Sequence, residues 1–195
     1  LKTLWYISFL KMYSTKIEPK YNPNPNPRIG LIALASDFTI EKDFINVIKD
    51  RGIDFFVNRI ECYNPLTSEN LIKMSQKVTE VTKDILPDQN IDCVAYACTS
   101  GTIAAGYNSI EQKIKVAKPE AKVTTPSTAA LKALKKLKIQ KLSIFTPYSK
   151  KLNEEVVEYF KKENFNVTSN SYFDIESDID IGKVDQNYLY DVLSK

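Results

Sequence analysis

The feature that most constrains the fold of this chain is a regular alternation of short apolar runs with segments of helical periodicity. Residues Arg28 to Leu34 form an almost continuous apolar run, which is typical of a strand buried on both faces of a parallel sheet. From Ile40 to Asp50 the apolar residues recur at helical spacing, and the run Ile53 to Ile60 again has strand character. These three segments predict a βαβ unit at the start of the fold.

The alternation continues and predicts two similar sets of elements. The rest of the first set comprises helices at about 68–86 and 102–116 and strands at 91–97 and 122–124. The second set comprises helices at 127–137 and 150–163, strands at 141–146 and 166–171, and a helix that begins at 185. The pattern predicts an α/β protein of two doubly wound parallel-sheet lobes, residues 28–122 and residues 123–195. Because no strand follows the last helix, we expect the second lobe to be incomplete at its C-terminus.

Residues 1–27 are predicted to be a leader and a linker that precede the lobes. Asparagine and proline alternate from Asn22 to Pro27, and each proline favours extended geometry in the residue before it. The apolar stretch Leu4 to Leu10 is far shorter than the roughly 20 residues of a membrane-spanning helix. No small-residue cleavage site for a signal peptide follows it. We therefore expect no membrane association.

The composition excludes several function classes. The chain has no histidine, which rules out Ser-His-Asp hydrolases, histidine-ligated zinc sites and imidazole bases, and we predict no metal site. Its 27 Lys and Arg residues nearly balance 24 Asp and Glu residues, and no basic stripe indicates a nucleic-acid partner. The three cysteines contain no CxxC pair, which argues against a disulfide framework and fits a reducing cytoplasm. Any acid-base catalysis must therefore use thiols, carboxylates, lysines or tyrosines.

Cys98 stands where a buried strand passes into the first turn of a helix, a position at which open α/β sheets bind ligands. Unpaired amides and the helix dipole are expected to lower the pKa of its thiol, which could then act as a nucleophile or a base. The hydroxyls of Thr99 and Ser100, beside free amides, predict a cradle for a carboxylate. The alternative is that Cys98 only packs and that Thr99 and Ser100 only cap the helix.

Two further residues are expected at the same edge of the sheets. Asp37 follows the first strand and opens a helix, so that it either faces the ligand or caps the helix through an Asx turn. Tyr148 follows the strand 141–146, where its phenol either closes over a ligand or is an ordinary surface group. Of the other cysteines, Cys93 is predicted to pack within its strand and Cys62 to be incidental in a loop.

Taken in order, several segments resemble the aspartate/glutamate racemase superfamily, and within it the maleate cis-trans isomerase and arylmalonate decarboxylase group with its ectoine-utilisation relatives. These segments are Arg28 to Ile32 with Asp37 to Glu41, Ala97 to Thr102, Thr124 to Leu131, and Thr146 to Tyr148 followed by Leu152-Asn153. The resemblance runs from Arg28 to about Leu193. It implies two similar α/β lobes with the active site between them, no cofactor, and a catalytic thiol from each lobe.

The resemblance also implies roles for individual residues. Cys98 corresponds to the first-lobe cysteine of racemases and isomerases, a position that is glycine in the decarboxylases. Thr99, Ser100 and Tyr148 correspond to residues that hold a substrate carboxylate. The chain departs from the family pattern in two ways: Asp37 stands where maleate isomerases usually have asparagine, and the expected second-lobe cysteine is not in this sequence.

The leading hypothesis is a cofactor-independent isomerase or racemase of small carboxylic acids, similar to maleate isomerase. The Cys98 thiolate would either add to an alkene carbon of a cis-dicarboxylate or abstract a proton α to a carboxylate. The alternatives are a non-catalytic protein that binds small carboxylates, and a decarboxylase of substituted malonates, which a cysteine at this position disfavours. The expected partner is a small mono- or dicarboxylate in the cytoplasm, without nucleic acid or membrane, and a homo-oligomer remains open.

Overall fold

The predicted apolar runs form parallel strands in a computed structural model that describes residues 14–23 and 25–194. The first sheet has the order β2-β1-β3-β4 and consists of β1 (Arg28–Leu34), β2 (Asp54–Ile60), β3 (Cys93–Tyr96) and β4 (Lys122–Thr124). Its neighbouring strands are all parallel, and Ile29 of β1 lies opposite both Phe55 of β2 and Cys93 of β3. In the second sheet β5 (Lys141–Thr146) pairs in parallel with β6 (Asn166–Tyr172). The α/β class and the parallel sheets are therefore confirmed.

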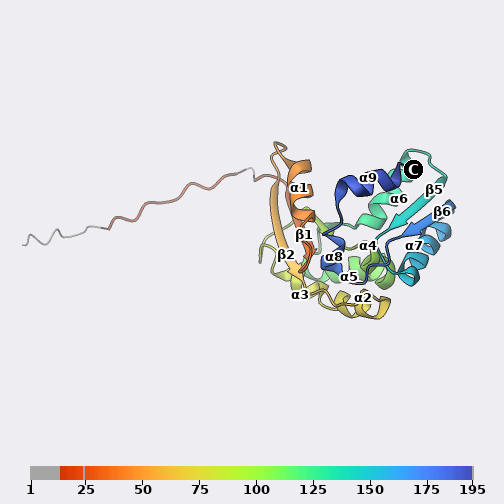
Figure 1. The fold of residues 1–195 in the computed structure, drawn as a ribbon. Coiled ribbons are helices and arrows are strands. Elements are labelled where there is room, and N and C mark those ends of the chain that lie inside the picture. Colours follow the sequence, from red (N-terminus) through yellow and green to blue (C-terminus); the bar gives the residue numbers. More distant parts are fainter. Residues whose placement is uncertain (1–13, 24, 195) are drawn as a thin grey trace, which may run out of the picture.

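Helices cover both faces of the first sheet and flank the second (Figure 1). Their bounds are α1 (Ile40–Ile48), α2 (Ser68–Ser75), α3 (Val78–Lys83), α4 (Thr99–Ala105), α5 (Tyr107–Ala117), α6 (Pro126–Lys136), α7 (Lys150–Lys162), α8 (Asp178–Ile181) and α9 (Gln186–Leu193). On one face, Met74 of α2 and Ile110 of α5 are buried with Ile32 of β1. On the other face, Leu31 packs against Phe44 of α1. Burial on both faces explains why β1 is an unbroken apolar run.

Two of the predicted long helices are each divided in two. The segment 68–86 forms α2 and α3, and the segment 102–116 is shared by α4 and α5. The second division falls at Gly106, whose φ of 79° and ψ of 134° suit glycine and cannot continue a helix. α4 also begins earlier than predicted, at Thr99, with Cys98 as its N-cap. Apolar periodicity does not reveal such short helices, because they lack a full apolar stripe.

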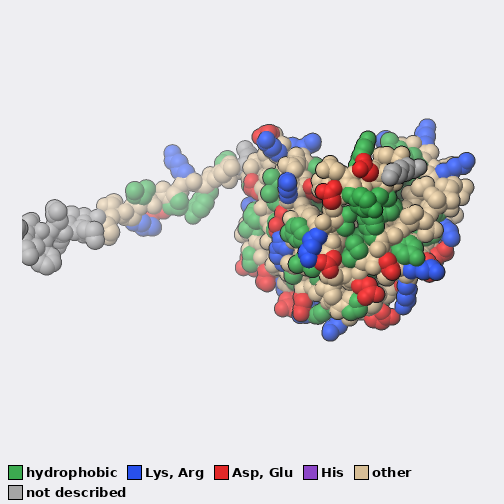
Figure 2. Space-filling view, viewed as in Figure 1, with side chains coloured by type: hydrophobic (Ala, Val, Ile, Leu, Met, Phe, Trp, Pro, Cys, Tyr) green, Lys and Arg blue, Asp and Glu red, His purple; other side chains and the backbone are tan. Residues whose placement is uncertain are grey.

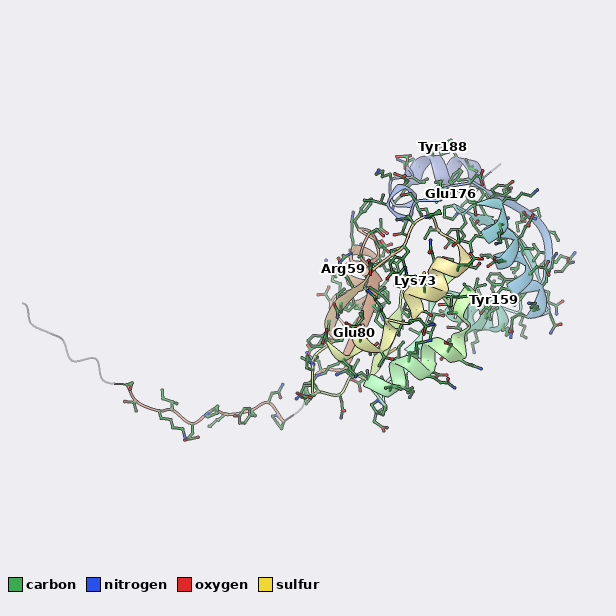
Figure 3. All side chains as sticks on the ribbon, turned by 90° about the horizontal axis from the view of Figure 1, so that it is seen from below. Arg59, Lys73, Glu80, Tyr159, Glu176 and Tyr188 are labelled. Carbon is green, nitrogen blue, oxygen red and sulfur yellow. The ribbon has the colours of Figure 1, made fainter. Side chains whose placement is uncertain are left out.

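The segment that follows β6 crosses from the second sheet to the first. The Ile175 amide donates to the Pro147 carbonyl at 2.9 Å, beside the end of β5. The Leu66 amide then donates to the carbonyl of Glu176 at 2.8 Å, which holds the segment against the loop after β2 (Figure 3). The segment continues into α8, which the sequence did not predict. We call residues 173–182 the crossing segment.

The chain ends of the described part differ in character. Residues 14–23 and 25–27 of the predicted leader and linker are exposed and run away from the folded part (Figure 1), while residues 1–13 and 24 of that segment lie outside the described residues. Within the described ranges, no helix is long and apolar enough to cross a membrane. At the other end, Tyr188, Tyr190 and Leu193 of α9 are exposed, and Figure 2 shows hydrophobic side chains gathered over this helix. Because β4 completes the first sheet, we propose that the lobes divide after Thr124 rather than after residue 122.

Candidate active site

Cys98 lies just beyond β3, at the carboxyl end of the first sheet, where the sequence predicts a strand-to-helix junction, and its side chain caps α4. Its Sγ accepts a hydrogen bond from the Gly101 amide at 3.2 Å, and the Ser100 hydroxyl lies 3.8 Å away. Its carbonyl oxygen accepts a hydrogen bond from the Thr102 hydroxyl at 2.6 Å, so the backbone of the cap is also fixed. The thiol is therefore held in one orientation at the start of α4.

The structure indicates that the Cys98 thiol is protonated at neutral pH, contrary to the expectation from the sequence. Cys98 is only 4% exposed, and burial raises the pKa of its thiol to about 12. The hydrogen bonds from Gly101 and Ser100 oppose this rise, while Cys62 and Asp178 add to it. The prediction of a lowered pKa is therefore wrong for the protein without ligand. Desolvation of the sulfur outweighs the stabilisation that one amide and a short helix provide.

Tyr148 comes from the second sheet and meets the cap of α4. Its phenol forms hydrogen bonds with the side chains of Ser100 and Thr99, which lower its pKa, but burial is the larger effect and raises that pKa to about 12. The phenol is therefore protonated at neutral pH and is available as a donor. The structure thus brings Cys98, Thr99, Ser100 and Tyr148 together, as the sequence and the resemblance predict.

Asp37 has the capping role that the sequence left open. Its Oδ1 accepts hydrogen bonds from the amide and hydroxyl of Thr39, at 2.7 and 2.9 Å, and from the Ile40 amide at 3.1 Å. This is an Asx-type arrangement at the start of α1. The Asp37 carbonyl accepts from Arg59 at 2.6 Å, and the same guanidinium forms an ion pair with Glu41 at 2.7 Å. The charge of Asp37 also raises the pKa of the Asp178 carboxyl, which in turn acts on Cys98.

Asp178 is a site residue that sequence reasoning missed. The Ser36 hydroxyl, after β1, donates to its carboxylate at 2.5 Å, and its own amide donates to the Asn64 side chain at 3.0 Å. Burial, followed by the charge of Asp37, raises the pKa of the Asp178 carboxyl. Its ionised form also acts on both Cys98 and Tyr148. No local signal identifies it, because only the crossing segment carries it to the first sheet.

Cys62 is likewise placed differently from the prediction that it is incidental. It packs half-buried against the core that contains Cys98, and burial raises the pKa of its thiol to about 11. Asp178 raises the pKa of Cys62 further, and a hydrogen bond with the Ser36 side chain lowers it. Cys93, in contrast, lies in β3 opposite Ile29, within the sheet as expected.

The charge that acts on this site comes from carboxylates. The Asp178 carboxylate acts on Cys98, Cys62 and Tyr148, and the Asp37 carboxylate acts on Asp178. Within the described ranges, no lysine or arginine is among the groups that shift the pKa values of these four side chains. Thr99 and Tyr148 also line a groove of about 410 Å³. The other walls of this groove are mainly apolar: Leu134, Leu142, Ile144, Phe145, Val156 and Phe160. No group of three His, Cys, Asp or Glu side chains in the described residues could hold a metal ion.

Fold and site together define an α/β protein with two parallel sheets, in which a thiol and several hydroxyls meet where strands from both sheets end. The family described as arylmalonate decarboxylase matches residues 62–195, which is most of the chain. The chain belongs to this family, and the resemblance to the maleate isomerase and arylmalonate decarboxylase group is confirmed.

The relatives of known sequence and structure extend this result. The maleate isomerase of Geobacillus stearothermophilus is 23% identical over 180 residues, which are 85% of this chain and 71% of that protein. The maleate isomerase of Pseudomonas putida is 26% identical over 171 residues, or 81% and 68% of the two chains.

Two solved structures show the same fold. The maleate isomerase Iso of Pseudomonas putida strain S16 matches with a TM-score of 0.78 and 21% identity, over 87% of this chain and 73% of that chain. A cysteine-to-serine variant of the Nocardia farcinica maleate cis-trans isomerase, with a covalently bound succinylcysteine intermediate, matches with a TM-score of 0.77 and 20% identity over 86% and 72%. The predicted fold class is therefore confirmed.

Proposed function

We propose that this protein is a cofactor-independent isomerase or racemase of small carboxylic acids, similar to maleate isomerase, with Cys98 as its nucleophile or base. The observation that carries the proposal is the meeting of the Cys98 thiol with the hydroxyls of Ser100 and Tyr148 where strands of both sheets end. The relatives named maleate isomerase, one of them with a succinylcysteine intermediate, support it.

In this proposal the hydroxyl groups hold a substrate carboxylate. Thr99, Ser100 and Tyr148 donate hydrogen bonds to its oxygens, and the apolar groove beside them accommodates the hydrocarbon part. Because these donors are neutral, they bind the carboxylate without adding a positive charge to the site. They also stabilise the extra negative charge that develops on the carboxylate during reaction.

Two reactions use this arrangement. In isomerisation, the Cys98 thiolate bonds to one alkene carbon of a cis-dicarboxylate, and the alkene electron pair moves toward the carboxylate on the other carbon. Rotation about the new single bond and return of that electron pair expel the thiolate and leave the trans acid. In racemisation, the thiolate instead takes the proton α to the carboxylate, and a second acid on the opposite face must supply the proton that returns to the carbanion.

The test is the substitution Cys98→Ser, assayed with maleate, aspartate and arylmalonates. We expect turnover of whichever substrate the wild type accepts to fall by about a thousandfold or more, because the nucleophile or base is lost. Fumarate absorbance, chiral chromatography of aspartate and carbon dioxide release identify the reaction. Cys93→Ser is the matched control, because Cys93 lies in the sheet, and it should keep its activity. Unchanged turnover in Cys98→Ser would remove this thiol from the mechanism.

A non-catalytic carboxylate-binding protein is the second candidate, and the buried, protonated thiol favours it. Calorimetric binding of a dicarboxylate to the wild type, with no turnover of any substrate, would establish this alternative. Carbon dioxide release from an arylmalonate would instead establish a decarboxylase. We also propose a cytoplasmic location, since the three cysteines are free, as a reducing compartment requires. A homo-oligomeric state and the absence of a nucleic-acid or membrane partner stay predictions.

A further inference from the structure

Tyr96, the last residue of β3, carries a buried hydroxyl group that the mechanism above does not use. Its side chain is 0% exposed and belongs to the core that also contains Cys98. No other described residue forms a hydrogen bond of good geometry with this hydroxyl. Buried polar groups without a partner are rare and cost stability, so this hydroxyl requires an explanation.

The position of this hydroxyl relative to Cys98 follows from Gly101. A Cβ atom on Gly101 would lie 2.8 Å from the Cys98 Sγ and 2.9 Å from the Tyr96 hydroxyl oxygen. The two polar atoms therefore flank the same small space. The Met74 methyl group, 3.2 Å from that point, closes the space with an apolar group. The Tyr96 hydroxyl and the Cys98 sulfur thus face the same point inside the core.

The chemistry of sulfur explains why this donor has no good partner in the protein without ligand. A neutral thiol is a weak acceptor, whereas a thiolate is an anion that accepts charge-assisted hydrogen bonds. The hydroxyl is therefore poorly satisfied while Cys98 is protonated and becomes satisfied when Cys98 ionises. An interaction that forms only in the reactive state favours that state selectively.

We propose that Tyr96 is a positioning residue that donates a hydrogen bond to the Cys98 thiolate and so raises the fraction of reactive thiolate. This inference rests on the proposed function, in which the thiolate is the reacting species. Tyr96 acts as a donor and transfers no proton itself. Burial, followed by the neighbouring Cys98, holds the pKa of the Tyr96 phenol far above its usual range, which keeps the donor protonated.

The test compares the wild type with Tyr96→Phe by the rate at which iodoacetamide alkylates each cysteine between pH 7 and 10, measured by peptide mass spectrometry. Below the pKa of Cys98, its alkylation rate is proportional to its thiolate fraction. Loss of a hydrogen bond to a charged group should slow alkylation of Cys98 by about ten- to a hundredfold. Cys93 is the internal control, because neither Tyr96 nor Cys98 is among the groups that shift its pKa, and its rate should not change. The melting temperature should stay equal or rise, because a poorly partnered buried hydroxyl has been removed.

Tyr107→Phe is the matched control. The Tyr107 hydroxyl has partners, Glu111 at 3.1 Å and the Val123 carbonyl at 3.2 Å, so its removal should lower the melting temperature and leave Cys98 alkylation unchanged. The proposal is overturned if iodoacetamide alkylates Cys98 in the Tyr96→Phe variant at the wild-type rate at every pH. It is also overturned if the Tyr96→Phe variant has a lower melting temperature than the wild type or fails to fold. The Tyr96 hydroxyl would then stabilise the folded protein rather than the thiolate. A wild type without turnover would contradict the proposed function, while the alkylation comparison would still decide this inference.

Discussion

At the scale of single residues, Gly101 sets how closely the reactive groups approach one another. Its hydrogen atom faces the Cys98 sulfur, the Tyr96 hydroxyl and the Met74 methyl, all within 3.2 Å of where a Cβ would lie. Its amide is also the donor that contacts Cys98 Sγ. A side chain at this position would displace the sulfur or the phenol, because a well-packed core has no space into which they can move.

We predict that Gly101→Ala lowers both stability and reactivity. Overpacking of a core by one methyl group should reduce the free energy of unfolding by about 1–3 kcal/mol, measured by urea denaturation. It should also reduce turnover and change the alkylation rate of Cys98. Gly30→Ala is the control for overpacking away from the thiol: its Cβ would meet buried Ile85 at 3.0 Å and buried Ile91 at 3.6 Å, so it should lower stability but leave Cys98 alkylation unchanged. If Gly101→Ala kept full turnover while Gly30→Ala lost it, the proposed packing of the site would be wrong.

At the scale of elements, the division between α4 and α5 shows how backbone conformation limits a helix. Gly106 adopts φ 79° and ψ 134°, and nothing lies within 4 Å of where its Cβ would be. Its conformation is therefore required by the turn between the helices and not by crowding. The turn lets α4, capped by Cys98, end at Ala105, while α5 packs Ile110 and Ile114 into the core.

Gly106→Ala should be destabilising through backbone strain alone. An L-residue held in this region of φ and ψ costs about 1–3 kcal/mol in the free energy of unfolding, which urea denaturation would detect. Asn108→Ala, at an exposed position in α5, is the comparison and should change stability by less than about 0.5 kcal/mol. Equal stability of Gly106→Ala and the wild type would indicate that α4 and α5 can join into one continuous helix.

At the scale of the whole molecule, the crossing segment joins the two sheets and places a carboxylate beside the thiol. Asp178 is fixed by Ser36 and Asn64, from the loops after β1 and β2. Its pKa is raised from the ordinary value of 3.8, mainly by burial, so the folded protein binds this proton more tightly than the unfolded chain does. Above the pKa of the folded state, the ionised carboxylate therefore reduces stability, and the cost disappears below the pKa of the unfolded chain.

We therefore predict that Asp178→Asn raises the melting temperature at pH 7 to 8 and that the difference shrinks as the pH falls toward 4. The amide can still accept the hydrogen bond from Ser36, while the charge is removed. The same substitution should lower the pKa of Cys98 and of Tyr148, because the ionised carboxylate raises both. Faster alkylation of Cys98 would report this change. A melting-temperature difference that does not depend on pH would contradict the assignment.

Asp178→Asn also tests substrate charge. Because the Asp178 carboxylate acts on the thiol, we expect it to repel a doubly charged dicarboxylate more strongly than a monocarboxylate. The variant should therefore lower the KM for maleate, if maleate is a substrate, more than the KM for a monocarboxylate. Equal effects on both substrates would mean that Asp178 does not face the ligand.

The local sequence pattern was sufficient to predict the parallel strands and most helix positions. It also predicted that Cys98, Thr99 and Ser100 lie at a strand-to-helix junction. These follow from side-chain periodicity and from the turn chemistry of neighbouring residues, which act over a few positions. The pattern also placed Tyr148 at the carboxyl end of a strand, but only the resemblance implied that this strand of the second sheet ends beside Cys98.

Only the tertiary structure decided three features of the site. These are the protonation of Cys98, the position of Asp178 and Cys62 near it, and the absence of a hydrogen-bond partner for the Tyr96 hydroxyl in the described chain. Each is a matter of desolvation or of contact between residues far apart in the chain. Ser36 and Asp178, for example, are 142 positions apart, yet share a hydrogen bond. The amides at the start of α4 indicate a stabilised thiolate, but the free energy of removing water from the sulfur is the larger quantity, and it exists only once the core has closed around it.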